Sequence, residues 1–225
     1  MTNTTKFAEP TSKETPMNTT LIVACLHAVH DSVIANEADI ESLDRAIGDG
    51  DHYLNVKRGC EVLVAMQAEL ERQTPSAALN SIGMKLLSTI GGASGPLISG
   101  FFIAMGKALK GNDAPSRSDF AQAFAAGVEA IKQRGKADVG EKTMLDVLIP
   151  VSRLLIKLNK DGVALPELCE SLNAEATRNM LATRDMIATK GRAYSLGERA
   201  LGHIDPGCKT SEVAIAAVCA EVLNS

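Results

Sequence analysis

The sequence of 225 residues contains no tryptophan, and aromatic residues together make up only 3% of it. Modules that bind single-stranded nucleic acid stack the bases on aromatic side chains, so this scarcity argues against such a module. The net charge of −4 provides no basic surface for DNA, RNA or an anionic membrane. The composition therefore predicts neither a nucleic-acid partner nor a membrane partner.

The five cysteines are odd in number and form no C-x-x-C pair, so neither a disulfide framework nor a zinc site is indicated. A reducing cytoplasm fits this pattern best. Residues 1–16 are polar and lack the apolar core of a secretion signal, and we expect them to be a disordered extension. Residues 86–106 carry no charge, but the glycines and the proline among them predict two buried helices rather than a membrane span.

Apolar residues make up 45% of the chain and are mostly aliphatic, which favours closely packed helices. No segment alternates at period two, whereas helical spacing of apolar residues recurs throughout. We expect an all-α fold of eight helices in a single domain over residues 17–225. The helices begin near residues 18, 51, 75, 96, 116, 140, 166 and 206. A short acidic connection follows the first helix, and Pro150 should kink the sixth helix or remove one backbone hydrogen bond from it.

Short joins between helices of similar length predict antiparallel neighbours, so successive joins alternate between the two ends of the bundle. The joins before the second, fourth, sixth and eighth helices should then share one end. They contain, in order, an aspartate cluster, a glycine turn at 91–96, residues 134–142 and residues 190–207. We therefore expect the unusual chemistry of this chain to gather on one rim.

The stretch from Leu43 to Asn55 places Asp44, Asp49 and Asp51 close together in a segment interrupted by two glycines. A glycine-broken turn between two helices can point all three carboxylates at one cation, and a hard divalent ion such as Mg²⁺ prefers oxygen ligands. Aspartates also cap helices in ordinary turns, which remains the alternative. Three like charges so close together favour the metal site. We assign hydrogen bonding rather than catalysis to His52.

Three further segments have both a structural and a functional interpretation. The turn Gly91-Gly92-Ala93-Ser94-Gly95-Pro96 opens a helix, where free N–H groups favour phosphate, although such turns are also common as tight loops. Asp205-Pro206-Gly207 suits the cap of the last helix or a ligand contact. Lys190-Gly191-Arg192 suits a helix C-terminus or a functional loop.

Six segments, taken together and in this order, resemble the nucleotide-binding L subunit, or L domain, of dihydroxyacetone kinases, from about residue 20 to the C-terminus. They are Asp44-x4-Asp49-Gly50-Asp51-His52-x-x-Asn55, Gly91-Gly92-Ala-Ser-Gly-Pro96, Arg134-Gly135-Lys136, Gly140-x-Lys142-Thr143-Met144-x-Asp146, Gly191-Arg192-Ala193 and Gly202-His203-x-Asp205-Pro206-Gly207.

The resemblance implies a closed barrel of eight antiparallel helices that holds ADP or ATP through two Mg²⁺ ions on one rim. It implies that Asp44, Asp49 and Asp51 bind the metal. The implied nucleotide contacts are His52, Tyr53, Leu54, Asn55, Ala93, Ser94, Gly135, Met144, Arg192, Asp205, Pro206 and Gly207.

By the same resemblance the chain is the phosphoryl-donating half of a kinase, and a separate K-type subunit holds dihydroxyacetone or a similar short ketose or polyol. The phosphoryl source is either exchangeable ATP or a phosphotransferase-system carrier, of M type, that recharges bound ADP. Tyr53 departs from the family's usual glycine, and this departure bears on the nucleotide rim or a partner contact. Two alternatives stay open, a regulatory subunit that only senses nucleotide and an all-α Mg²⁺-dependent nucleotide hydrolase.

Overall fold

The computed structural model describes residues 17–92 and 94–225, and these residues form helices and turns without any strand. The prediction of an all-α fold is confirmed. The predicted disordered extension, residues 1–16, lies outside the described residues. The helices are α1 (Thr19–Ala35), α2 (Glu37–Ile47), α3 (His52–Val64), α4 (Gln67–Leu70), α5 (Pro75–Thr89), α6 (Ser94–Ala108), α7 (Arg117–Gly135), α8 (Leu145–Lys160), α9 (Leu165–Ala182) and α10 (Pro206–Asn224), with two 3₁₀ segments, η1 (Thr183–Asp185) and η2 (Arg192–Ala200).

The eight longest helices, α1, α3 and α5 to α10, correspond to the eight that the sequence predicts. Two shorter helices are additional. The acidic stretch after α1, expected to be a connection, forms α2 because Ile40 and Ile47 lie on one buried face. The second predicted helix ends at Val64 rather than near residue 73, and α4 follows it.

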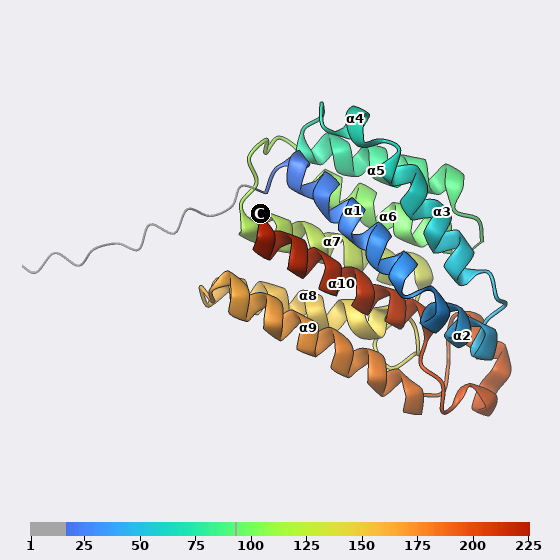
Figure 1. Ribbon diagram of the computed structural model, residues 1–225. Helices are drawn as coiled ribbons and strands as arrows, with labels where there is room; N and C mark the ends of the chain where they lie inside the picture. The colour runs from blue at the N-terminus through green and yellow to red at the C-terminus, as the bar shows by residue number, and fades with distance from the viewer. Residues whose placement is uncertain (1–16, 93) are drawn as a thin grey trace, which may run out of the picture.

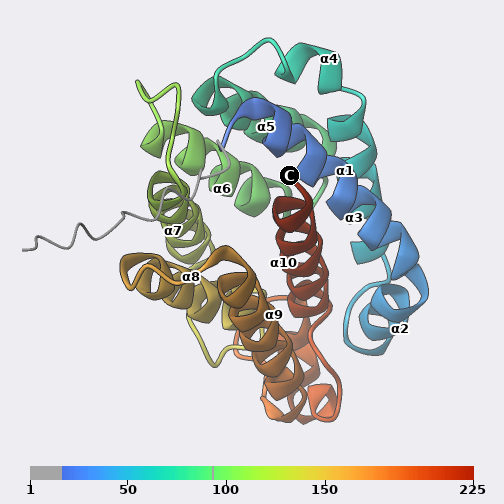
Figure 2. The same ribbon diagram turned by 60° about the vertical axis from the view of Figure 1, so that its left-hand side comes forward.

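The eight longest helices pack in a closed sequence of neighbours, from α1 through α3, α5, α6, α7, α8 and α9 to α10 and back to α1. Figure 1 shows these helices side by side, and Figure 2 shows the same arrangement from an oblique direction. The uncharged stretch 86–106 is divided between α5 and α6, which pack against each other as predicted. Among the described residues we find no helix with the length and apolarity that crossing a bilayer requires.

Aliphatic side chains fill the interior in several clusters rather than one. One cluster joins α3, α5 and α6 through Leu63, Ile82 and Met105, and another joins α8 and α9 through Val151 and Leu172. Burial of each large aliphatic side chain contributes about 1.5–3 kcal/mol, which makes these clusters the main source of stability. The core therefore fixes the helix ends from which the site is built.

Helix boundaries near the predicted site depend on local capping. The side chain of Asp205 accepts a hydrogen bond from the N–H of Cys208 and caps α10, as the sequence predicts. Helix α8 begins at Leu145, five residues later than expected, and continues through Pro150. Figure 1 shows α2 beside the chain between α9 and α10, and α2 packs against η2 there.

Candidate functional site

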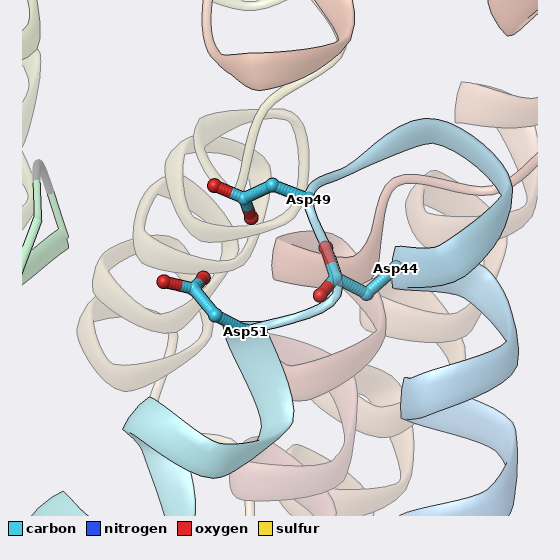
Figure 3. Close-up of side chains that lie close together, drawn as sticks. All are labelled: Asp44, Asp49 and Asp51. Carbon is cyan, nitrogen blue, oxygen red and sulfur yellow. The ribbon is translucent and has the colours of Figure 1, made fainter.

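The three aspartates predicted to bind metal come from the connection between α2 and α3. Asp44 lies in the last turn of α2 and is buried, with 1% of the residue exposed. The helix ends at Ile47 and is capped by Gly48, where a Cβ would overlap the carboxylate of Asp44. Gly50 has a φ of 79° and turns the chain back, so that Asp51 immediately precedes α3. One carboxylate oxygen from each aspartate lies within 4.8 Å of the other two (Figure 3).

The buried carboxylate of Asp44 is only half satisfied by the protein. Its Oδ2 accepts a hydrogen bond from the backbone N–H of His52 at 2.9 Å. Its Oδ1 is buried without a hydrogen-bond partner among the residues that the structure describes. A buried carboxylate oxygen carries a large desolvation cost unless a donor or cation compensates it. The oxygen donors gathered here fit a hard divalent cation such as Mg²⁺.

Arg192 in η2 reaches this cluster from far along the chain. Its Nη1 donates to the carboxylates of both Asp49 and Asp51. The hydrogen bond from Arg192 holds the pKa of Asp51 below its ordinary value. Arg192 therefore serves the carboxylates rather than the C-terminus of α9, which ends at Ala182.

The glycine turn between α5 and α6 lies next to Arg192. Gly92 has a φ of 68°, and a Cβ on it would be 3.4 Å from Nη2 of Arg192. Ala93 lies outside the described residues. Because the first N–H groups of an α-helix have no partner inside the helix, the start of α6 suits an anion. The predicted phosphate turn and the predicted metal ligands thus meet at one place.

Gly95→Ala should destabilise the protein because the glycine packs directly against the main chain. A Cβ at Gly95 would overlap the carbonyl oxygen of Ile90, so the turn must open. We expect the free energy of unfolding, measured with urea, to fall by about 1–3 kcal/mol. Gly91→Ala is the matched control, since no atom lies within 4 Å of a Cβ there. Equal stability of the two variants would contradict this account of the turn.

The start of α10 completes the same rim. Nε2 of His52 lies 2.8 Å from Oγ1 of Thr210 in α10. Burial is the main reason that the pKa of His52 is lowered, so the ring is neutral at pH 7. Burial also raises the pKa of Asp205 to about 6. A neutral His52 can hydrogen bond without adding to the positive charge that Arg192 brings.

Other predicted contact residues also gather at this end. A Cβ at Gly207 would lie 3.5 Å from Cβ of Met144, so the start of α10 faces the start of α8. A Cβ at Gly135 would lie 3.6 Å from Leu97 in the first turn of α6. Ser94 is the first residue of α6. The predicted convergence of four joins is therefore present in the described residues.

The residues after His52 point in different directions. Leu54 is 53% exposed, whereas Asn55 is buried. Tyr53 is 2% exposed and packs with Ile40 and Val213 in the core, so its side chain does not face the rim. Successive residues of a helix are about 100° apart around its axis, and this rotation turns Tyr53 inward.

The sequence gives no role to Lys142, yet its side chain is buried beside this site. Its ammonium group donates to backbone carbonyl oxygens of the segment that carries Arg192. Hydrogen bonds to backbone carbonyls cannot be predicted from a sequence motif, since every residue has a carbonyl group. The place of Lys142 in the motif Gly140-x-Lys142-Thr143-Met144-x-Asp146 was the only available signal.

Comparison with known proteins places the chain in a family. The DAK2 domain model matches residues 46–220. The "PEP-dependent dihydroxyacetone kinase, ADP-binding subunit DhaL" of Escherichia coli is 37% identical over 191 residues, which cover 85% of this chain and 91% of that protein. The "PTS-dependent dihydroxyacetone kinase, ADP-binding subunit DhaL" of Lactococcus lactis is 39% identical over 183 residues, 81% of this chain and 86% of that protein.

The fold has a relative among solved structures. The crystal structure of the dihydroxyacetone kinase from C. freundii in complex with AMP-PNP and Mg²⁺ superposes with a TM-score of 0.71 at 23% identity. The match covers 98% of this chain and 37% of that one, so this chain corresponds to little more than a third of the solved kinase. The family model and the sequence identities together show that the chain belongs to the DAK2 domain family, beside the ADP-binding subunits of dihydroxyacetone kinase.

Proposed function

We propose that residues 17–225 form one nucleotide-binding domain that donates a phosphoryl group to dihydroxyacetone, or to a similar short ketose or polyol, held by a separate K-type subunit. The observation that carries this proposal is the convergence of Asp44, Asp49 and Asp51 beside Arg192 and the start of α6. Carboxylates, a guanidinium group and free backbone N–H groups are the parts that phosphoryl transfer requires.

The three aspartates would hold Mg²⁺, and we propose two ions, as the family resemblance implies. The unpartnered Oδ1 of Asp44 supports a cation at this place, because the protein itself offers it no donor among the described residues. Bound Mg²⁺ would neutralise the negative charge on the phosphate oxygens. Asp44 is held in place by the backbone of His52, so one ligand is rigid while Asp49 and Asp51 are more exposed.

The remaining predicted contacts would bind the nucleotide around these ligands. The N–H groups at the start of α6 and the guanidinium of Arg192 would offset phosphate charge, and neutral His52 would donate or accept a single hydrogen bond. Tyr53 is left out because it is buried in the core. The proposed contacts are His52, Leu54, Asn55, Ala93, Ser94, Gly135, Met144, Arg192, Asp205, Pro206 and Gly207.

The names of the relatives support a choice of phosphoryl source and of partners. Identity is 37–39% with two ADP-binding DhaL subunits that are named PEP-dependent or PTS-dependent, and 32% with the L-erythrulose kinase of Pectobacterium atrosepticum. The names of the two DhaL subunits support bound ADP that a phosphotransferase-system carrier recharges, rather than exchangeable ATP. The same names support dihydroxyacetone as the first acceptor to test, with erythrulose as the second.

The test begins with the purified chain, from which mass spectrometry identifies any nucleotide that copurifies. Phosphate release and acceptor phosphorylation are then measured with and without a K-type subunit, using either ATP or a phosphorylated carrier. We expect ADP to copurify with the chain alone. We expect a phosphorylated ketose only when the K-type subunit and the carrier are both present.

Two results would contradict the proposal. Nucleotide binding without product under every condition would make the chain a nucleotide-sensing regulator. Release of phosphate from ATP by the chain alone, at the rate seen with the partner, would make it a hydrolase. Product from ATP without a carrier would contradict only the assignment of the phosphoryl source.

A further inference from the structure

Lys142 occupies an unusual position for a charged residue. It lies in the turn before α8 with a φ of 61°, a backbone conformation that residues other than glycine rarely adopt. Only 1% of the residue is exposed. Its Nζ lies 2.7–3.1 Å from four backbone carbonyl oxygens, those of Thr183, Met186, Ala200 and His203.

These four carbonyls belong to the two ends of one segment, residues 183–203, which we call the Arg192 segment. Thr183 and Met186 lie where the chain leaves α9, and Ala200 and His203 lie where it approaches α10. The middle of the segment carries Arg192, which pairs with Asp49 and Asp51. One ammonium group thus ties both ends of a segment whose centre contacts the carboxylate cluster.

The chemistry of the contact explains why the residue is a lysine. An ammonium group has three N–H donors on a flexible stem and can satisfy several carbonyls at once, with one donor shared here. Burial lowers the pKa of Lys142, so the carbonyl contacts must offset the loss of water around the charge. A hydrocarbon side chain would fill the same space without that cost, but would leave four carbonyls, two of them in buried contacts, without this donor.

Other hydrogen bonds and apolar contacts also hold the segment. The N–H of Thr189 donates to the carbonyl of Glu141 at 3.3 Å, and the N–H of Gly202 donates to the carbonyl of Arg184 at 2.9 Å. Small side chains of the segment pack on Ile47, whose helix carries Asp44. The hydrogen bond between Gly202 and Arg184 joins the two ends to each other, whereas Lys142 ties both ends to the turn before α8.

We propose that Lys142 is a positioning residue that ties the two ends of the Arg192 segment to the start of α8 and thereby holds Arg192 over the carboxylate cluster. The tie is a property of the fold. Its consequence for nucleotide affinity rests on the proposed function, because it operates through a group that we propose to bind phosphate.

Hydrogen exchange measured by mass spectrometry tests the tie in the full chain. In Lys142→Met we expect peptides from 183–203 to exchange at least about tenfold faster than in the unmodified protein, while peptides from α5 and α6 keep their rates. Lys209→Met is the matched control, since this partly buried lysine pairs with Glu212 inside α10 and has no hydrogen bond to the segment. Unchanged exchange in 183–203, or faster exchange throughout the protein, would overturn the proposal.

A double-mutant cycle tests whether Lys142 acts through Arg192. We expect Lys142→Met to weaken Mg²⁺-dependent ADP binding about tenfold, but less than about twofold when Arg192→Ala is already present. Additive losses would overturn positioning, because a generally destabilised site loses affinity whether or not Arg192 is there. If Lys142→Met does not fold, Lys142→Gln serves in both measurements, since its amide still donates to part of the carbonyl set.

The two proposals fail in different ways. If the unmodified chain binds no nucleotide, the proposed function is wrong, yet the exchange measurement still decides whether Lys142 ties the segment. If the unmodified chain binds ADP and Lys142→Met leaves both exchange and affinity unchanged, only the role of Lys142 is wrong.

Discussion

Asp51→Ala is expected to abolish Mg²⁺-dependent nucleotide binding while the helical fold stays intact. The carboxylate side chains of Asp51 and Asp49 are 48% and 61% exposed, so removing either one costs little packing. Loss of a direct ligand should weaken binding by more than the roughly 10–100-fold that follows when a residue merely supporting a ligand is changed. Isothermal titration with Mg²⁺ and ADP measures the affinity, and circular dichroism melting measures the fold.

Asp39→Ala provides the matched control for the loss of one negative charge. Asp39 lies in the first turn of α2, on the same helix as Asp44 but at its other end. We expect nucleotide affinity in this variant to stay within about twofold, because Asp39 is exposed and solvent and salt screen its charge. If Asp51→Ala binds ADP as tightly as Asp39→Ala does, the assignment of Asp51 as a metal ligand is wrong.

Asp44→Ala should differ from Asp51→Ala in one respect. It removes a ligand as well, so binding is lost, but it also leaves the backbone N–H of His52 without its acceptor. Such a loss inside a protein costs about 1–3 kcal/mol of unfolding free energy. A titration and a urea denaturation curve on the same preparations separate the two effects.

The helices were largely predictable because aliphatic residues recur at helical spacing over most of the chain. The exception is α2, which acidic residues made to look like a connection. Its buried positions Ile40 and Ile47 are seven residues apart, or about two helical turns, which is a helical signal in itself. The acidic composition of this stretch therefore suggested a connection, although the spacing of its isoleucines indicated a helix.

The carboxylates could be found from the sequence because they are neighbours in it, whereas their counter-charge could not be paired with them. Arg192 lies 143 residues from Asp49, and the alternation of joins and the family resemblance suggested that the two share one end of the bundle but not that they pair. The direction of the Tyr53 side chain could not be predicted from the local sequence either, because neighbouring positions in a helix can face the rim and the core.

Arg192→Lys is expected to slow phosphoryl transfer much more than it weakens nucleotide binding. The guanidinium of Arg192 contacts Asp49 and Asp51 together, so it lies where phosphate charge would be neutralised. A lysine keeps the charge but lacks the planar fork that contacts two oxygen groups in fixed geometry. Arginines that stabilise phosphoryl-transfer transition states contribute about 10³–10⁵-fold in rate, and we expect a loss near the lower end.

Single-turnover transfer to dihydroxyacetone in the presence of the K-type subunit measures the rate, and titration with ADP measures the affinity. Arg199→Lys is the control, because Arg199 is an exposed arginine of the same 3₁₀ segment. A rate for Arg192→Lys equal to that of Arg199→Lys would show that Arg192 only balances the charge of the carboxylates. A large loss of rate with affinity nearly unchanged would show that the shape of the guanidinium group, and not its charge alone, is used in the transition state.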